Sequence, residues 1–562
     1  MKLHHQKPIF PWRGLLLAFA FCLALAGCHK TQQTAPTTAP AVSPATAPAP
    51  SPNSSGCTLP ADQSHTDAKT PSKITPEQAR QLFALVDVLI KFSSDETGLP
   101  IKSSVKRQLT SRDAVEKYLE EKFNEDEGTK RLQRDEIVLK KFGLLDHDFE
   151  LKPFLLALLK EQIEAYYDSK TKTVNLLDWV GPDEEQPVLA HELTHALQDQ
   201  HSDLEKWNDQ TPDDVSTESA GDNDHLAKDE MDTARDAVAE GQATVVMWDC
   251  ELKPMGKSLV KDPEVLDFIK SRMSSADDSP VMARAPLLLS ESMLFPYREG
   301  MSFEQDVWMD QGQAAAFAGA LDRPPTSSWE IINPREYEKK HIPAIPLLPN
   351  IHPLTDSAYK PYDIGQVGQL DVHILSELLG SDNAARDLTP AWNGGLYWAG
   401  QLRSATTPAQ LADTASIGLF YLSIWKSADS AQVFARIYSN TLGRKYSHVG
   451  ELSSGTSTAG DGSVEHLFTT NEGPVLITTR GKMVFIAESF PLPLARQLTA
   501  IILDAQGAGP MHMAQMPREF RTPPVAPSGA LTTDLVHFFA EAGVMKAVVD
   551  AERLALKKTL AP

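Results

Sequence analysis

Two histidines four residues apart constrain this chain more than any other feature of its sequence. His191 and His195 lie within residues 183–201, whose pattern predicts a helix, and Glu192 follows the first histidine. Positions i and i+4 share one face of a helix, so both imidazoles can bind one metal ion with Glu192 beside it. Zinc suits this set, because it accepts nitrogen ligands tetrahedrally and can leave one position for water. We therefore expect one Zn²⁺ ion.

A catalytic zinc needs a third protein ligand, and Glu240 is the first choice. It lies on the next predicted helix, residues 233–249, among alanines and valines where a carboxylate needs a positive partner. Gly241 beside it would let the backbone approach another element closely. A surface position for this glutamate stays open, and the competing ligands are Asp232, Asp236 and His201.

The residue types predict a hydrolytic mechanism. Zinc would activate a water molecule and polarise a carbonyl, and Glu192 would serve as general base and then general acid. Stabilisation of the oxyanion needs a further donor, for which Tyr297 and Arg298 are candidates. The alternatives are that Tyr297 packs in the core and that Arg298 is a surface charge.

The N-terminus is typical of an export signal. Basic residues precede an apolar run over residues 14–27, which is too short to span a bilayer. The small residues that end this run, followed by Cys28, resemble the lipobox of bacterial lipoproteins. This predicts a signal peptide over residues 1–27 and a lipid on Cys28 that tethers the protein to a membrane. An ordinary secretory signal or an N-terminal anchor is the alternative.

The predicted location is the cell envelope. His29 after the lipidated cysteine favours the outer membrane facing the periplasm in a Gram-negative cell, and otherwise the cell surface. Residues 28–70 are rich in Pro, Ala, Ser and Thr and predict a disordered stalk. Cys57 and Cys250 would remain in an oxidising compartment, paired or as thiols. With 75 acidic against 53 basic side chains, the net charge of −22 argues against a nucleic-acid partner.

The rest of the chain predicts an α+β fold in several parts. Residues 71–362 form a mainly helical domain with a short hairpin over 165–177, and residues 363–525 a smaller α+β domain. Residues 526–562 contain a single amphipathic helix over 533–558. Residues 202–236 hold 12 acidic and 3 basic side chains, which we interpret as a solvated loop in preference to a calcium site or binding surface. A Pro-rich connection is expected over 286–362, followed by a small sheet covered by helices on one face. The predicted strands of this sheet are 418–425, 464–470, 475–479 and 483–488, and its helices are 430–442 and 492–503.

Residues 191–201, HELTHALQDQH, followed by a helix with Glu240 and Gly241, resemble the gluzincin branch of zincin metallopeptidases. They are most similar to a group of bacterial and archaeal proteins with HELTHALQDQ-like motifs. The chain departs from that group in Gly-Gln after Glu240 and in the long acidic segment before it. Further residues that match the group in order are Tyr166, Tyr167, Asp168, Phe295, Pro296, Tyr297, Gly300, Trp392, Gly394 and Gly395. The resemblance implies a zincin-like domain and a zinc peptidase with His191, His195 and Glu240 as ligands.

The function expected from the sequence is a membrane-anchored, zinc-dependent peptidase that acts on a protein or peptide substrate. A second hypothesis is a catalytically idle lipoprotein that keeps the zincin scaffold as a binding or assembly factor. A third is a zinc hydrolase of a non-peptide amide, such as a cell-wall bond. The presence of Glu192 favours an enzyme, because a scaffold without catalysis has no need of a general base.

Overall fold

The computed structural model describes residues 73–551 with the exception of 126, 180–181, 209, 211–215, 274–278, 457–461, 507–530 and 544. The predicted signal peptide, Cys28, Cys57 and the stalk to residue 70 lie outside the described residues. The fold is mixed α+β, as expected. None of the helices in the described part of the chain combines the length and the apolar composition that a bilayer span requires. The predicted domain boundaries at residues 362 and 525 stay predictions.

The first elements surround a three-stranded sheet with the order β1-β3-β2. The hairpin is confirmed as β2 (Tyr166–Asp168) and β3 (Thr173–Leu177), which pair antiparallel. The helical pattern expected before them misses β1 (Lys106–Thr110), which pairs parallel with β3. Its sequence KRQLT has one large apolar residue, so its pairing with β3 decides its conformation. The helices of this part are α1 (Pro76–Thr97), α2 (Arg112–Glu125), α3 (Glu127–Phe142) and α4 (Leu151–Gln162).

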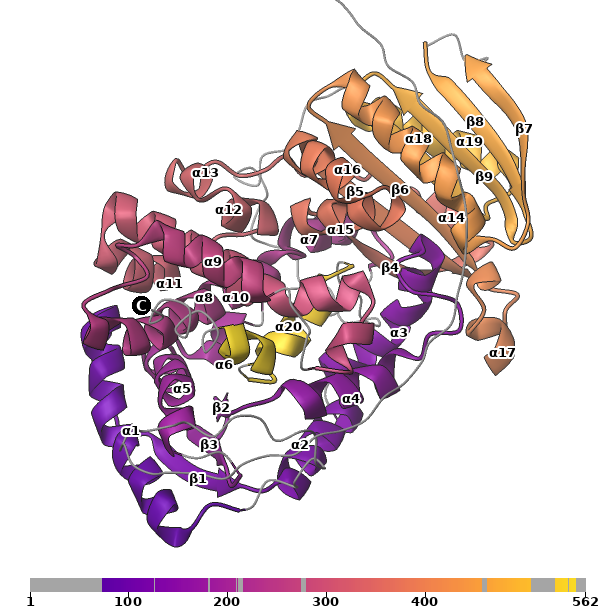
Figure 1. Ribbon diagram of the computed structural model, residues 1–562. Coiled ribbons are helices and arrows are strands. Elements are labelled where there is room, and N and C mark those ends of the chain that lie inside the picture. Colours follow the sequence, from indigo (N-terminus) through magenta and orange to yellow (C-terminus); the bar gives the residue numbers. More distant parts are fainter. Residues whose placement is uncertain are drawn as a thin grey trace, which may run out of the picture. The chain divides into compact units, whose positions relative to one another are not determined.

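Three long helices form the centre of the helical part (Figure 1). They are α5 (Pro182–Ser202), α8 (Met231–Leu252) and α10 (Leu287–Gln311), and α8 packs against both of the others. Gly241 confirms the close approach expected of it: a Cβ there would lie 2.3 Å from the carbonyl carbon of Gly300 on α10. The two backbones thus touch directly.

The Pro-rich connection predicted over residues 286–362 is wrong in its first part, which is helix α10. Pro296 lies inside this helix and is buried. Proline removes one backbone hydrogen bond from a helix, and tertiary packing overrides that local cost here. Every residue from Ser292 to Tyr297 is buried against neighbouring elements.

The acidic segment over residues 202–236 is also different from the expected solvated loop. It contains α6 (Leu204–Asn208), α7 (Ser219–Lys228) and the start of α8. Five of its carboxylates are at most 3% exposed. Local charge composition cannot reveal the polar partners that distant segments bring to these groups. The five buried acids are Asp222, Asp229, Glu230, Asp232 and Asp236.

The later part of the chain forms a seven-stranded antiparallel sheet with the order β4-β5-β6-β10-β9-β8-β7. The four predicted strands are confirmed, and three others were not foreseen. The foreseen strands are β6 (Ile417–Trp425), β8 (Val464–Thr470), β9 (Gly473–Arg480) and β10 (Met483–Glu488). The others are β4 (Tyr359–Gln366), β5 (Trp392–Leu402) and β7 (Val449–Thr456).

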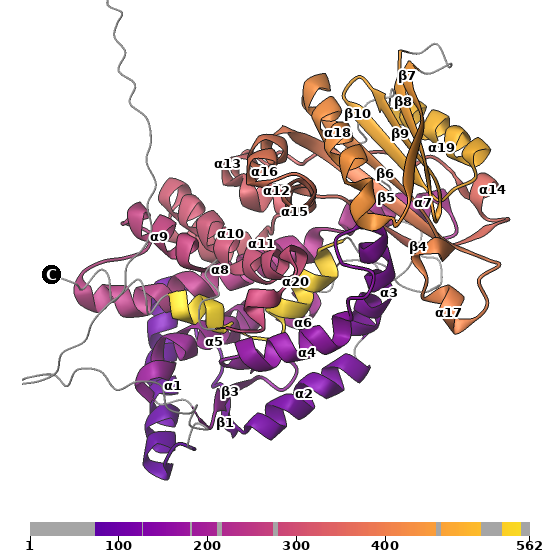
Figure 2. The same ribbon diagram turned by 45° about the vertical axis from the view of Figure 1, so that its right-hand side comes forward.

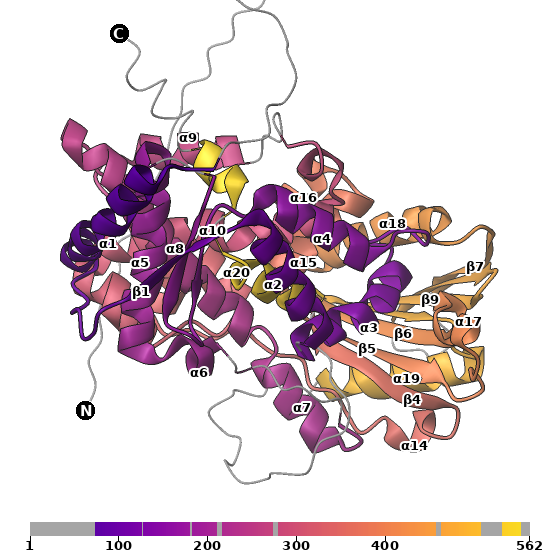
Figure 3. The same cartoon turned by 90° about the horizontal axis from the view of Figure 1, so that it is seen from below.

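Helices cover both faces of this sheet, so the expectation of one covered face is wrong (Figure 3). On β6, Tyr421 packs edge to face against Phe434 of α18 (Ala428–Lys445). Its neighbour Phe420 points the other way, into a second cluster with Leu498 of α19 (Leu492–Ala505). Successive side chains of a strand alternate between faces, and both sets on β6 are apolar. The apolar residues on both faces of β6 therefore fit a sheet that is covered on both sides.

The helix predicted over residues 533–558 is interrupted. Helix α20 (Thr533–Ala540) ends at a turn, and Gly543 after it has a φ of +104°. Residues 546–551 are helical again. Figures 1 and 2 show α20 beside α8 and α10, far along the chain from either. The other α-helices of the described chain are α9 (Pro263–Met273), α11 (Ala320–Asp322), α12 (Ser328–Ile332), α13 (Pro334–Glu338), α14 (His352–Thr355), α15 (Gln369–Leu379), α16 (Asp382–Leu388) and α17 (Pro408–Leu411).

Candidate metal centre

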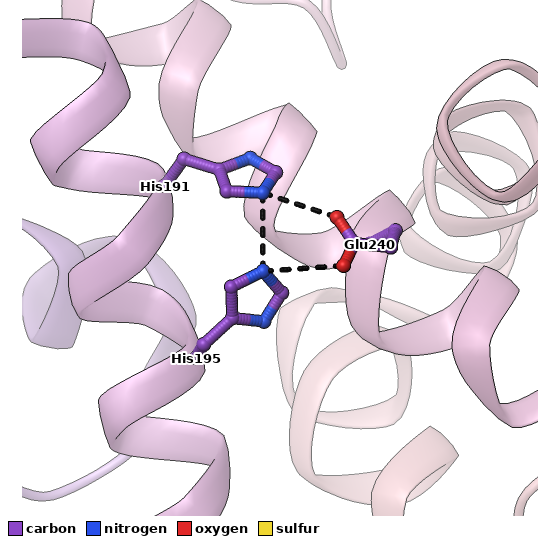
Figure 4. Close-up of side chains that lie close together, drawn as sticks. All are labelled: His191, His195 and Glu240. Atoms are coloured by element: carbon purple, nitrogen blue, oxygen red, sulfur yellow. Dashed lines mark hydrogen bonds and ion pairs between the residues drawn. The ribbon is translucent and has the colours of Figure 1, made fainter. Parts of the chain in front are cut away.

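Helices α5 and α8 bring His191, His195 and Glu240 together (Figure 4). His191 Nε2 lies 3.0 Å from His195 Nε2 and 3.1 Å from Glu240 Oε2. His195 Nε2 lies 3.5 Å from Glu240 Oε1. All three side chains are buried, and their ligand atoms lie within 4.8 Å of one another. Among the described residues, this is the group of His, Cys, Asp and Glu side chains that could hold a metal ion.

The competing residues have other partners. His201 Nε2 lies 2.9 Å from Asp322 Oδ1, at the end of α5. Asp236 Oδ2 lies 3.0 Å from His537 Nδ1. Asp232 Oδ1 accepts a hydrogen bond from a backbone amide. The third position beside the two histidines is therefore occupied by the glutamate of α8.

Gln198 fixes the orientation and tautomer of His195. Its Nε2 donates to the carbonyl of Ala239 and to Oε1 of Gln242, both at 2.9 Å, so its Oε1 faces His195 Nδ1 at 2.9 Å. Nδ1 of His195 therefore carries a proton, and Nε2 is the ring nitrogen that faces His191 and Glu240 and could bind a metal ion. Sequence reasoning missed Gln198, although its place three residues after His195 puts it on the same helix face.

The charges around this group favour a cation. Burial raises the pKa of Glu240, but the two imidazoles outweigh burial and lower it to about 2. Burial lowers the pKa of His195, but the charge of Glu240 outweighs burial and, with Glu192, raises it to about 9. A positive charge is thus stabilised where the two nitrogens and the carboxylate converge. The donor set of two imidazole nitrogens and one carboxylate fits a zinc ion.

Tyr297 is buried in the core and also lies next to the proposed metal ligands. Its ring stacks against that of His191 with centroids 6.2 Å apart, and its hydroxyl donates to the carbonyl of Gly543 at 3.1 Å. Burial, with the carboxylates of Glu240 and Glu192, raises its pKa well above the usual value of 10. Tyr297 therefore stays a neutral hydrogen-bond donor. Its role toward an oxyanion stays a prediction.

Arg298, the other candidate for this role, pairs with Glu291 and Glu299 of its own helix. Its guanidinium is thus neutralised by its neighbours on α10. The core position predicted as an alternative for Tyr297 is confirmed, whereas Arg298 is largely buried and not a plain surface charge.

A cavity of about 600 Å³ opens beside the ligands. Glu192, His195 and Glu240 contribute to its lining, so the predicted general base and two predicted ligands share one space. The hairpin residues Tyr167 and Asp168 also line this cavity. The hydroxyl of Tyr167 donates to Asp199 of α5 at 2.7 Å, which holds the hairpin against the helix of the histidines.

No family model, no curated protein and no solved structure matches this chain. The likeness to gluzincins therefore stays a prediction from the sequence motif. The geometry of the group stands independently of that likeness: a buried set of two histidines and one glutamate that could hold a metal ion.

Proposed function

We propose that this protein is a zinc-dependent peptidase. The observation that carries the proposal is the convergence of His191, His195 and Glu240 beside a cavity that Glu192 also lines. A zinc site with a purely structural role usually has four protein ligands. Here two of the three proposed ligands, His195 and Glu240, line a cavity of about 600 Å³ together with Glu192, a carboxylate that is not a ligand.

The roles follow from the residue types. His191, His195 and Glu240 would hold the ion, which supplies the Lewis acidity that activates a water molecule and polarises the scissile carbonyl. A carboxylate oxygen of Glu192 accepts the proton of the attacking water and delivers it to the nitrogen of the leaving amine. The peptide C–N bond breaks, and the hydroxyl of the water stays on the new carboxyl group.

We further propose that a lipid on Cys28 anchors the enzyme to a membrane of the cell envelope. The support is the sequence of the N-terminus, with basic residues, a short apolar run and small residues before the cysteine. Mass spectrometry of the purified full-length protein tests it. A diacylglyceryl-modified N-terminal Cys28 is expected, and an unmodified cysteine after complete processing would contradict the anchor.

One experiment tests the catalytic assignment. Zinc content and cleavage of a peptide library are measured on the full chain and on three variants. Glu192→Gln is expected to keep zinc and to lose about 10²-fold or more in rate, since general base catalysis contributes 10²–10⁴-fold. His191→Ala loses both zinc and cleavage. Glu264→Gln, an exposed change of the same chemistry on α9, is the matched control and keeps both.

Three results would contradict the proposal. Cleavage retained in Glu192→Gln removes the general base, and a wild-type chain without zinc removes the metal chemistry. Zinc-loaded protein that leaves every peptide intact but cuts a cell-wall amide identifies the non-peptide hydrolase instead.

A further inference from the structure

The cavity beside the metal ligands takes part of its lining from residues far along the chain. We call residues 531–551 the C-terminal segment, without 544, which the structure does not describe. Ala540, Glu541 and Gly543 of this segment line the same cavity as Glu192 and His195. Ala540 is the last residue of α20, and the other two form the turn that follows it. The turn therefore borders the space next to the proposed zinc.

His537 attaches this turn to the helix of the third ligand. Its Nδ1 lies 3.0 Å from Asp236 Oδ2, and its Nε2 lies 3.5 Å from Glu541 Oε1. Asp236 precedes Glu240 by four residues, so both carboxylates lie on one face of α8. Burial lowers the pKa of His537, but Asp236 and Glu541 outweigh burial and raise it to about 10. The imidazolium thus joins the turn and α8 by charge at neutral pH.

A second attachment holds the far end of the turn. The carbonyl of Gly543 accepts the hydrogen bond from Tyr297, and a Cβ at Gly543 would lie 2.1 Å from the carbonyl oxygen of Ala165. Its positive φ adds a second reason for glycine. Two residues on, Met545 forms an isolated bridge with Ile163. The turn is therefore fixed on both sides, against α8 and α10 and against the segment before β2.

Burial shows that the C-terminal segment is part of the core. Several of its apolar side chains are at most 5% exposed, and the segment packs on α3, α8 and α10. A segment buried in this way does not leave without exposing core. It is a fixed boundary of the cavity. These side chains are Leu535, Val536, Phe538, Phe539, Met545, Val548 and Val549.

We propose that residues 540–543 form one wall of the substrate-binding cleft, in which Ala540 and Glu541 contact the bound polypeptide. His537 is a positioning residue that holds this wall against α8. The inference rests on the proposed peptidase function and adds to it where the substrate binds. A substrate chain seated on the zinc would then pass between this wall and the helices that carry the ligands.

A bulky side chain at position 540 tests the wall. In Ala540→Trp the indole occupies part of the cavity, so we expect KM for a cleaved peptide to rise at least tenfold while zinc content stays at the wild-type level. Lys546→Trp is the matched control, because it places the same side chain on the same segment outside the cavity lining. It keeps the wild-type KM. Equal KM values for the two tryptophan variants would overturn the proposal that residues 540–543 contact the substrate.

Two hydroxamate probes separate the wall from the metal. Acetohydroxamic acid is small enough to reach zinc past the tryptophan, so its inhibition constant is expected to be unchanged in Ala540→Trp. A dipeptidyl hydroxamate must lie along the cleft and is expected to bind at least tenfold more weakly. Equal weakening of both probes would show a disturbed metal site and would overturn the proposal.

Two milder variants keep the test valid if Ala540→Trp fails to fold. Glu541→Ala and His537→Gln are each expected to raise KM more than kcat changes, with zinc content unaltered. Wild-type KM in both would overturn the wall even when Glu192→Gln is inactive, and the peptidase assignment would stand. Activity retained in Glu192→Gln, by contrast, would remove the peptidase function whatever the wall variants do.

Discussion

Two buried glutamates, Glu240 in the helical part and Glu488 in the seven-stranded sheet, have their negative charges compensated by different groups. Lys445 Nζ donates to the two oxygens of Glu488 at 2.7 and 2.8 Å, and the hydroxyls of Tyr438 and Tyr446 donate to them as well. Glu240 faces two imidazole nitrogens. A carboxylate that has its own lysine and two hydroxyls is complete. The positive charge beside Glu240 comes instead from His195, whose pKa is raised to about 9, and a bound cation can take the place of that proton.

Loss of Lys445 is expected to have the largest effect on stability. Lys445→Met leaves Glu488 buried without its cation, and breaking a buried ion pair from one side costs about 3–5 kcal/mol. Urea unfolding measures the change, with the exposed Lys360→Met as control. The double variant Lys445→Met, Glu488→Leu should recover part of the loss. A single variant as stable as the control would show that Lys445 does not stabilise the buried charge of Glu488.

Removal of the metal is expected to have the second largest effect on stability. It should act at Glu240 and leave the Glu488 cluster unchanged. A ligand present at 100 times its Kd stabilises the folded state by about 2.7 kcal/mol. A chelator is therefore expected to lower the free energy of unfolding of the wild type and of Lys445→Met alike. His191→Ala should be insensitive to the chelator. A wild-type protein whose unfolding ignores both chelator and added zinc would remove the contrast between the two regions.

The smallest effect concerns Glu230, a buried carboxyl that has neither a lysine nor a pair of imidazoles. Burial, together with Asp371, raises its pKa to about 8. Because the pKa is higher in the folded than in the unfolded chain, its contribution to stability is fully present below about pH 4.5. It is lost as the pH rises toward 8, with about 1 kcal/mol of that loss between pH 7 and pH 8.5. Glu230→Gln keeps an oxygen acceptor for Ser328 and should flatten this part of the profile of unfolding free energy against pH. A profile as steep as that of the wild type would contradict the raised pKa.

The sequence predicts the centre of the site well, because its residues follow local rules. The spacing of His191 and His195 places both on one helix face, and Glu240 among alanines indicates a carboxylate with an unusual environment. The partners that complete the site come from other segments. Gln198 could have been found from its helix face, whereas the contact of Tyr297 with Gly543 depends on tertiary packing that no local pattern contains.

The same limit explains the errors in the fold. Strand β7 is mostly exposed and polar, so it lacks the apolar alternation that marks a strand, and β5 begins with a register shift between Trp392 and Gly395. The acidic residues of 202–236 look like a solvated loop until distant groups such as His352 and Ser328 reach them. Both errors arise where pairing across long stretches of chain decides the local structure.

The cavity wall lies near the end of the described chain, so it is synthesised after the other parts of the site. A ribosome completes the helices that carry His191, His195 and Glu240 long before it reaches Gly543. A nascent chain therefore contains all three proposed ligands before the residues that form one side of the cavity have been made. The carbonyl that accepts the hydrogen bond from the Tyr297 hydroxyl is also still missing at that stage. Synthesis itself delays assembly of the site until its last wall has been made, and a chain clipped before residue 540 would return to that unfinished state.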